Sequence, residues 1–136
     1  MRNLRRRAAG LFACLVLAGM IAPAAATDTA FPFGSELVLD AAPLPGTKRM
    51  PTIEIDDDGA AAFNLWCARV SGSASVTDDA IAIVPSKTLS AQCTPERLKD
   101  DAALLAALSQ VTNWRRNGDV VDFLGVTPLR FRLMTN

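Results

Sequence analysis

The chain has 136 residues, with 14 basic side chains, 14 acidic side chains and no histidine. This length suits one domain with a modest hydrophobic core. Without histidine, a Ser-His-Asp or Cys-His catalytic arrangement is excluded, and so is a zinc site that needs imidazole ligands.

The N-terminal segment has the three parts of a secretory signal peptide. Basic residues 1–7 precede an apolar run from Ala8 to Ala22, and small residues then lead to Ala26. The apolar run is shorter than the roughly 20 residues that span a bilayer, so we predict cleavage after Ala26 rather than a retained anchor. Cys14 follows Leu-Phe-Ala, which is a weak match to a lipobox. The predicted location is the periplasm or the outside of the cell, with no membrane span after cleavage.

Removal of the signal peptide changes the charge of the chain. Residues 1–26 carry four arginines and no acidic residue, so residues 27–136 hold ten basic and fourteen acidic side chains, a net charge of −4. A nucleic-acid binder needs a basic face that displaces counterions from phosphates, so nucleic acid is not an expected partner. We expect residues 27–136 to fold as one unit, with a leader and first strand in residues 27–49 and the main domain in residues 50–136.

Alternating apolar residues predict strands in the first half of this unit. The expected strands cover residues 36–40, 53–55, 60–70 and 81–83. In the third strand, Phe63, Leu65 and Cys67 share one face and are expected to point toward a helix, which leaves Trp66 partly exposed on the other face. The Ser-Gly-Ser sequence at residues 71–73 predicts a turn after this strand.

A helix is predicted from Pro95 to about Gln110. Thr94 supplies a capping hydroxyl, Pro95 suits the first helical position, and Glu96 places an acid in the first turn. The expected core stripe consists of Leu98, Ala102, Leu104, Leu105 and Leu108. The residues expected to face water are Lys99, Asp100, Asp101 and Gln110.

The C-terminal part predicts three strands. Residues 111–116 and 119–125 are joined by Asn117-Gly118, a favourable hairpin dipeptide, and alternating residues 129–133 follow a turn at Pro128. Several strands, one helix and three further strands indicate an α+β fold, a mainly antiparallel curled β-sheet packed against one α-helix.

Two cysteines remain after signal cleavage, Cys67 and Cys93. Their separation of 26 positions is not the Cys-x-x-Cys arrangement of redox enzymes, and export favours a structural disulfide between them. The alternative is two buried thiols in a protein that never meets an oxidase.

No catalytic, cofactor-binding or metal-binding residue is predicted. Asp56, Asp57 and Asp58 lack the alternating spacing of a calcium loop and directly precede Gly59, which indicates a solvated turn. No glycine-rich phosphate loop is present.

Aromatic and basic residues suggest a binding surface. Trp114 and its neighbouring arginines would face the arginines of the last strand if the two strands paired, which would form a patch for an anionic ligand. The alternative is a core tryptophan beside a solvated basic edge. The candidate surface consists of Asn64, Trp66, Arg115, Arg116, Arg130 and Arg132.

These features together resemble the META domain (HslJ-like) family of bacterial envelope proteins, over about Met50 to Met134. The resemblance is carried by the acidic turn ending in Gly59, Cys67 followed by Gly72, Thr88 before Cys93, the helix ending Leu-Leu-Ala-Ala-Leu, Trp114, Gly118-Asp119, Phe123-Leu124-Gly125 and Leu129-Arg130-Phe131. Where the family commonly has Gly-Cys-Asn, this chain has Trp66-Cys67-Ala68.

The resemblance implies an exported α+β domain linked to stress or envelope homeostasis, without an established reaction. We therefore expect a non-catalytic protein whose partner is a periplasmic protein or a small ligand. The alternative is a secreted inhibitor of a protease or other hydrolase. A packed helix between Cys93 and the following hairpin would favour the META family over an all-β inhibitor.

Overall fold

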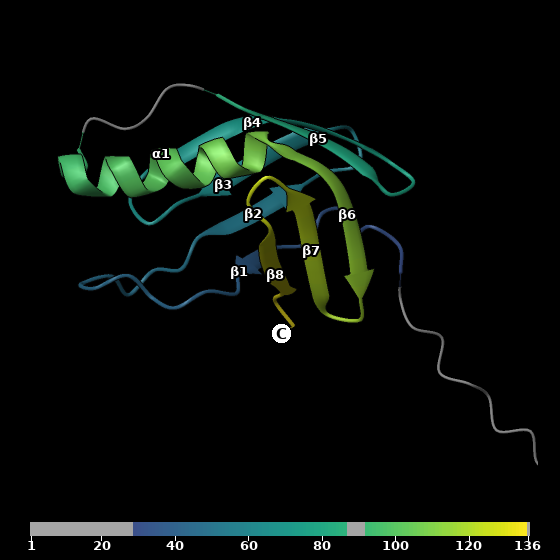
Figure 1. The fold of residues 1–136 in the computed structure, drawn as a ribbon, viewed down its shortest axis with the longest axis horizontal. Coiled ribbons are helices and arrows are strands. Elements are labelled where there is room, and N and C mark those ends of the chain that lie inside the picture. Colours follow the sequence, from purple (N-terminus) through teal and green to yellow (C-terminus); the bar gives the residue numbers. More distant parts are fainter. Residues whose placement is uncertain (1–28, 87–91, 136) are drawn as a thin grey trace, which may run out of the picture.

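The computed structural model describes residues 29–86 and 92–135, where alternating apolar residues and short turns form a series of strands (Figure 1). The strands are β1 (Leu37–Leu39), β2 (Thr52–Ile55), β3 (Ala60–Asn64), β4 (Arg69–Thr77), β5 (Ala80–Pro85), β6 (Val111–Asn117), β7 (Val120–Gly125) and β8 (Leu129–Leu133). Within these residues, one helix, α1 (Pro95–Ser109), separates β5 from β6. The predicted signal peptide, its cleavage site and Cys14 lie outside the described residues.

The strands form a closed antiparallel barrel in which each strand neighbours the next in sequence. Closure comes from β1, which pairs with β2 on one side and with β8 on the other, where Leu37 lies opposite Leu133. Phe63, Phe123 and Phe131 are fully buried in the core. The prediction of an α+β fold, a curled sheet packed on one helix, is therefore wrong. Inside a closed barrel most inward side chains cover one another, so this sheet does not need a helix layered over one whole face.

The predicted long strand over residues 60–70 is two strands, β3 and β4, joined by a tight turn. The Leu65 N–H donates to the Ala68 carbonyl oxygen at 2.8 Å, so the chain reverses at Trp66 and Cys67. Phe63 and Leu65 are buried as expected.

The predicted Ser-Gly-Ser turn at residues 71–73 lies inside β4. Gly72 is opposite Pro85 of β5, and a Cβ atom on Gly72 would lie 2.5 Å from the carbonyl oxygen of Val84. Gly72 therefore allows the two strands to approach closely, and the prediction of a turn here is wrong.

The predicted β6–β7 hairpin is confirmed, with Gly118 (φ +61°) and Asp119 as its two connecting residues, one position later than expected.

The helix α1 begins where the sequence predicts. Thr94 Oγ1 accepts the Arg97 N–H at 3.4 Å, and Pro95 is the first helical residue. The buried side chains of α1 are Asp101, Leu104, Leu105 and Leu108. The expectations that Asp101 is solvated and Ala102 buried are wrong, because the helix is turned so that the Asp101 carboxylate meets two backbone N–H groups.

The barrel wall is least continuous between β5 and β6. These strands pair where Ala80 lies opposite Asn113, and beside this pair the Trp114 N–H donates to the Asp79 carbonyl oxygen at 2.9 Å. Farther along β5, α1 lies beside the strand and contributes leucines to the core (Figure 1). The helix therefore completes the wall where the two strands separate. Over residues 29–86 and 92–135, no helix is both long and apolar enough to span a membrane.

Candidate functional site

The predicted arginines divide between two sides of the barrel wall. Arg115 of β6 and Arg130 and Arg132 of β8 lie on the outer face, and each side chain is more than half exposed. Arg116 follows Arg115 and leaves β6 on the opposite side, but it lies near the end of the strand, where its guanidinium donates to two backbone carbonyl oxygens and reaches the rim of a hollow that Arg115 also lines. The arginines of β6 and β8 are not direct neighbours, because β7 lies between the two strands.

Asp122 of β7 connects the arginines on either side of it. Its Oδ2 lies 3.1 Å from Arg115 Nε, its Oδ1 lies 2.7 Å from Arg130 Nε, and its side chain is 16% exposed. The hydrogen bond from Arg130 holds the pKa of Asp122 below its ordinary value against the opposing effect of burial, and Arg115 lowers it further. Asp122 in turn raises the pKa of Arg130. We call Arg115, Asp122 and Arg130 the arginine face.

Trp114 does not join this surface. It is 8% exposed, and its ring meets the edge of Phe31 with centroids 4.9 Å apart. Phe31 also contacts Phe33, so the segment before β1 packs over the tryptophan. The Trp114 Nε1 atom is buried and has no hydrogen-bond partner within the described part of the chain. The alternative interpretation, a core tryptophan beside exposed arginines, describes this arrangement.

Asn64 and Trp66 lie apart from the arginine face in strand order, at the end of β3 and in the turn that follows it. The Asn64 side-chain amide donates to Thr52 Oγ1 at 3.2 Å. Trp66 is partly buried and packs against the core. The six predicted binding residues are thus not brought together in one place, and their role in binding stays a prediction.

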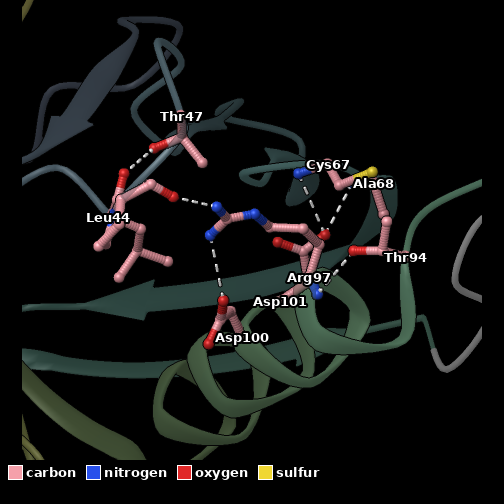
Figure 2. Close-up of polar contacts among 9 residues, drawn as sticks. Leu44, Thr47, Cys67, Ala68, Thr94, Arg97, Asp100 and Asp101 are labelled. Carbon is pink, nitrogen blue, oxygen red and sulfur yellow. Dashed lines mark hydrogen bonds and ion pairs between the residues drawn. The ribbon is translucent and has the colours of Figure 1, made fainter.

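The turn between β3 and β4 is attached to the start of α1 by a disulfide, and it is also held by the Asp101 carboxylate, whose contacts are drawn in Figure 2. The predicted disulfide between Cys67 and Cys93 is present, with an S–S distance of 2.01 Å. Beside it, Asp101 Oδ2 accepts the Ala68 N–H at 2.7 Å and the Cys67 N–H at 3.3 Å. Asp101 is fully buried and satisfies the buried Ala68 N–H as well as the partly buried Cys67 N–H.

A third segment, the loop between β1 and β2, reaches the same end of α1 (Figure 2). Arg97 donates to the Pro45 carbonyl oxygen and also pairs with Asp100 at 3.3 Å. The loop is closed by Thr47 Oγ1, which donates to the Leu44 carbonyl oxygen at 2.8 Å. The N-terminal part of α1, together with Cys93 just before it, therefore joins two loops of the barrel.

The acidic sequence at residues 56–58 forms the turn between β2 and β3. The Gly59 N–H donates to the Asp56 carbonyl oxygen at 3.0 Å, and Asp58 Oδ1 accepts the Ala60 N–H at 2.9 Å. Gly59 has φ +89°, which suits glycine. Among residues 29–86 and 92–135, no group of three or more acidic or cysteine side chains is placed to hold a metal ion.

An apolar groove of about 440 Å³ separates β5 from the outer side of α1. Its wall includes Val84, which is 63% exposed, and Ala102, Leu105 and Ala106 of the helix. The sequence did not predict this groove because Ala102 was assigned to the core.

The described residues form an antiparallel barrel with one helix in its wall, and a disulfide links the β3–β4 turn to the start of this helix. The META domain family matches residues 34–127, and the chain belongs to this family. No curated protein matches the chain.

Solved structures resemble the fold at low sequence identity. An NMR structure of a protein from Burkholderia xenovorans is 19% identical, with a TM-score of 0.60 over 76% of this chain and 84% of that one. A second NMR structure is 15% identical, with a TM-score of 0.57 over 74% of this chain and 89% of the other. The crystal structure of a DUF4847 family protein from Bacteroides vulgatus ATCC 8482 is 15% identical, with a TM-score of 0.50 over 60% of this chain. This chain spans 57% of that protein's length.

Proposed function

We propose that this chain is an exported, non-catalytic META-domain protein that acts by binding in the cell envelope, in a role linked to stress or envelope homeostasis. The observation that carries the proposal is the Cys67–Cys93 disulfide. Disulfides persist in oxidising compartments such as the periplasm and are rare in the reducing cytoplasm. The signal-like sequence of residues 1–26 supports the same location.

The arginine face supports a binding role. Its arginines are exposed, yet each guanidinium is held by Asp122, so the surface is ordered before a partner arrives. Ordered arginines lose little conformational freedom on binding, and planar guanidinium groups recognise anionic oxygens.

No specific observation favours the alternative of a secreted hydrolase inhibitor. The packed helix α1 lies between Cys93 and the β6–β7 hairpin, the arrangement expected for the META family. We therefore retain binding in the envelope as the proposed function.

Cell fractionation followed by intact-mass measurement tests the proposal. The full chain should be recovered from the periplasm as a species that begins at Thr27. A matched chain without residues 1–26 should stay in the cytoplasm. Recovery of the uncleaved full chain from the cytoplasm, or of a species that begins at a lipid-modified Cys14, would contradict the proposed export.

A further inference from the structure

Two hollows flank Asp122 on the outer surface of the barrel, and they differ in charge. The first, of about 430 Å³, is lined by Arg115, Arg116, Asn117, Val120, Asp122 and Arg130. The second, of about 390 Å³, includes Asp40 as well as Asp122 beside the same two arginines of the arginine face. Arg115 and Arg130 face one aspartate, Asp122, in the first hollow, whereas in the second they face both Asp122 and Asp40. The first hollow alone of this pair has an excess of positive charge.

The guanidinium groups of the arginine face keep hydrogen-bond donors for a ligand. Arg115 bonds to Asp122 through Nε, and neither of its terminal nitrogens has a partner among the described residues. Arg130 bonds to Asp122 through Nε and Nη2, so its Nη1 atom also has no partner among the described residues. Asp122 thus fixes one edge of each group and leaves the other edge for an acceptor.

Arg116 and Asn117 complete the first hollow. Arg116 Nε donates to the Gly118 carbonyl oxygen at 2.7 Å and Nη1 donates to the Ala30 carbonyl oxygen at 2.9 Å. These bonds fix the position of a third positive charge at the rim. Asn117, an exposed residue at the end of β6, contributes amide donors.

We propose that this hollow binds a phosphate-type oxyanion, with the terminal N–H groups of Arg115 and Arg130 as the principal donors and Asp122 as a positioning residue. The proposal rests on the proposed function, because it takes the arginine face as the binding surface. A phosphate group is available as a free ion or within a lipid headgroup, and the tetrahedral oxyanion is common to both.

An NMR titration of the protein recovered from the periplasm tests the site. Sodium phosphate is added at constant ionic strength, with chloride as the balancing ion, while the Asn117 amide and the Arg115 and Arg130 Nε–H signals are followed. Phosphate should cause saturable shifts that chloride does not cause. Arg115→Gln should weaken phosphate binding about tenfold, the loss expected for a charge-assisted hydrogen bond.

Arg132→Gln is the matched control. It removes the same charge from the same outer face, but Arg132 pairs with Asp40 at 3.0 Å and does not line the hollow. Phosphate affinity should therefore stay within about twofold of the wild-type value, apart from long-range screening. Equal weakening by the two substitutions would overturn the proposal, because it would show diffuse attraction instead of a site. Shifts that do not saturate would also overturn it.

Vesicles distinguish the two sources of phosphate. Cosedimentation with phosphatidylglycerol but not phosphatidylcholine vesicles, lost in Arg115→Gln and competed by free phosphate, would support the site with a lipid headgroup as its ligand. Phosphate binding without vesicle binding would support it with the free ion. If the protein binds neither phosphate nor vesicles, the site is refuted. A periplasmic species that begins at Thr27 would still support the proposed export in that case.

Discussion

Asp101 holds the β3–β4 turn against α1 through a fully buried carboxylate, and Asp101→Ala should lower the free energy of unfolding by about 2 kcal/mol. The substitution leaves the buried Ala68 N–H and the partly buried Cys67 N–H without their acceptor. A buried donor without a partner costs about 1–3 kcal/mol, and the longer bond to Cys67 adds less. Asp101 Oδ1 is buried without a hydrogen-bond partner among the described residues, so its removal offsets part of this cost.

Urea and thermal unfolding followed by circular dichroism measure this change. A loss of about 2 kcal/mol corresponds to a fall in Tm of roughly 8–16 °C for a domain of about 100 residues. Asp100→Ala is the matched control, because the side chain of this neighbour is 39% exposed and, within residues 29–86 and 92–135, pairs with Arg97 alone. An exposed pair of this kind contributes less than about 1 kcal/mol. Equal stability losses for the two variants would refute the argument that buried donors depend on Asp101.

The disulfide, the Asp122 carboxylate and Gly72 each allow a further test of the structure. Replacing both Cys67 and Cys93 by serine should cost about 3 kcal/mol in the chain-entropy model, and reductant should destabilise the wild type but leave this variant unchanged in thermal unfolding. Because the folded-state pKa of Asp122 is lowered, its stabilising contribution is present above its unfolded-state pKa and is lost as pH falls through the folded-state value. Urea unfolding between about pH 2 and pH 5 should show the small stability difference between wild type and Asp122→Asn shrinking as pH falls, and a widening difference would contradict this sign. Gly72→Ala should destabilise by about 1–3 kcal/mol in urea unfolding, because its Cβ would lie 2.5 Å from the Val84 carbonyl oxygen, and a neutral result would contradict that contact.

Local signals made the helix and the last hairpin predictable. Thr94 and Pro95 specify a helix start through their own chemistry, and Gly118 specifies a tight turn. The disulfide was predictable because the expected export would leave two cysteines in an oxidising compartment. In each case the information lies within a few residues or in the composition of the chain.

Closure of the barrel and the buried carboxylate were not predictable in this way. Pairing of β1 with β8 joins residues about a hundred positions apart, and three residues of β1 give no local sign of a second partner. Asp101 looks like a solvated residue because its backbone donors come from a distant turn. Gly72 looks like a turn residue because the residue that approaches it, Val84 of the next strand, lies twelve positions farther along the chain and leaves no sign beside the glycine.

The arginine face was predicted only in part. The prediction grouped Arg115 with Arg130 on the condition that their strands pair directly, whereas β7 lies between the two strands and the link through Asp122 was missed. The hairpin register puts Arg115 opposite Asp122, so opposite charges at equal distances from the turn were a usable signal.

The closed barrel positions both the arginine face and α1, and cross-strand nuclear Overhauser effects between β1 and β8 test it most directly. Leu37 lies opposite Leu133, and the flanking Met134 N–H donates to the Glu36 carbonyl oxygen at 3.0 Å, which makes Leu37 and Leu133 a non-hydrogen-bonded pair. The Cα atoms of such a pair are about 4.5 Å apart, close enough for a strong Hα–Hα signal. A strong Leu37–Leu133 signal is the predicted result. Its absence, together with retained signals between β1 and β2, would show an open curled sheet and contradict the closed barrel.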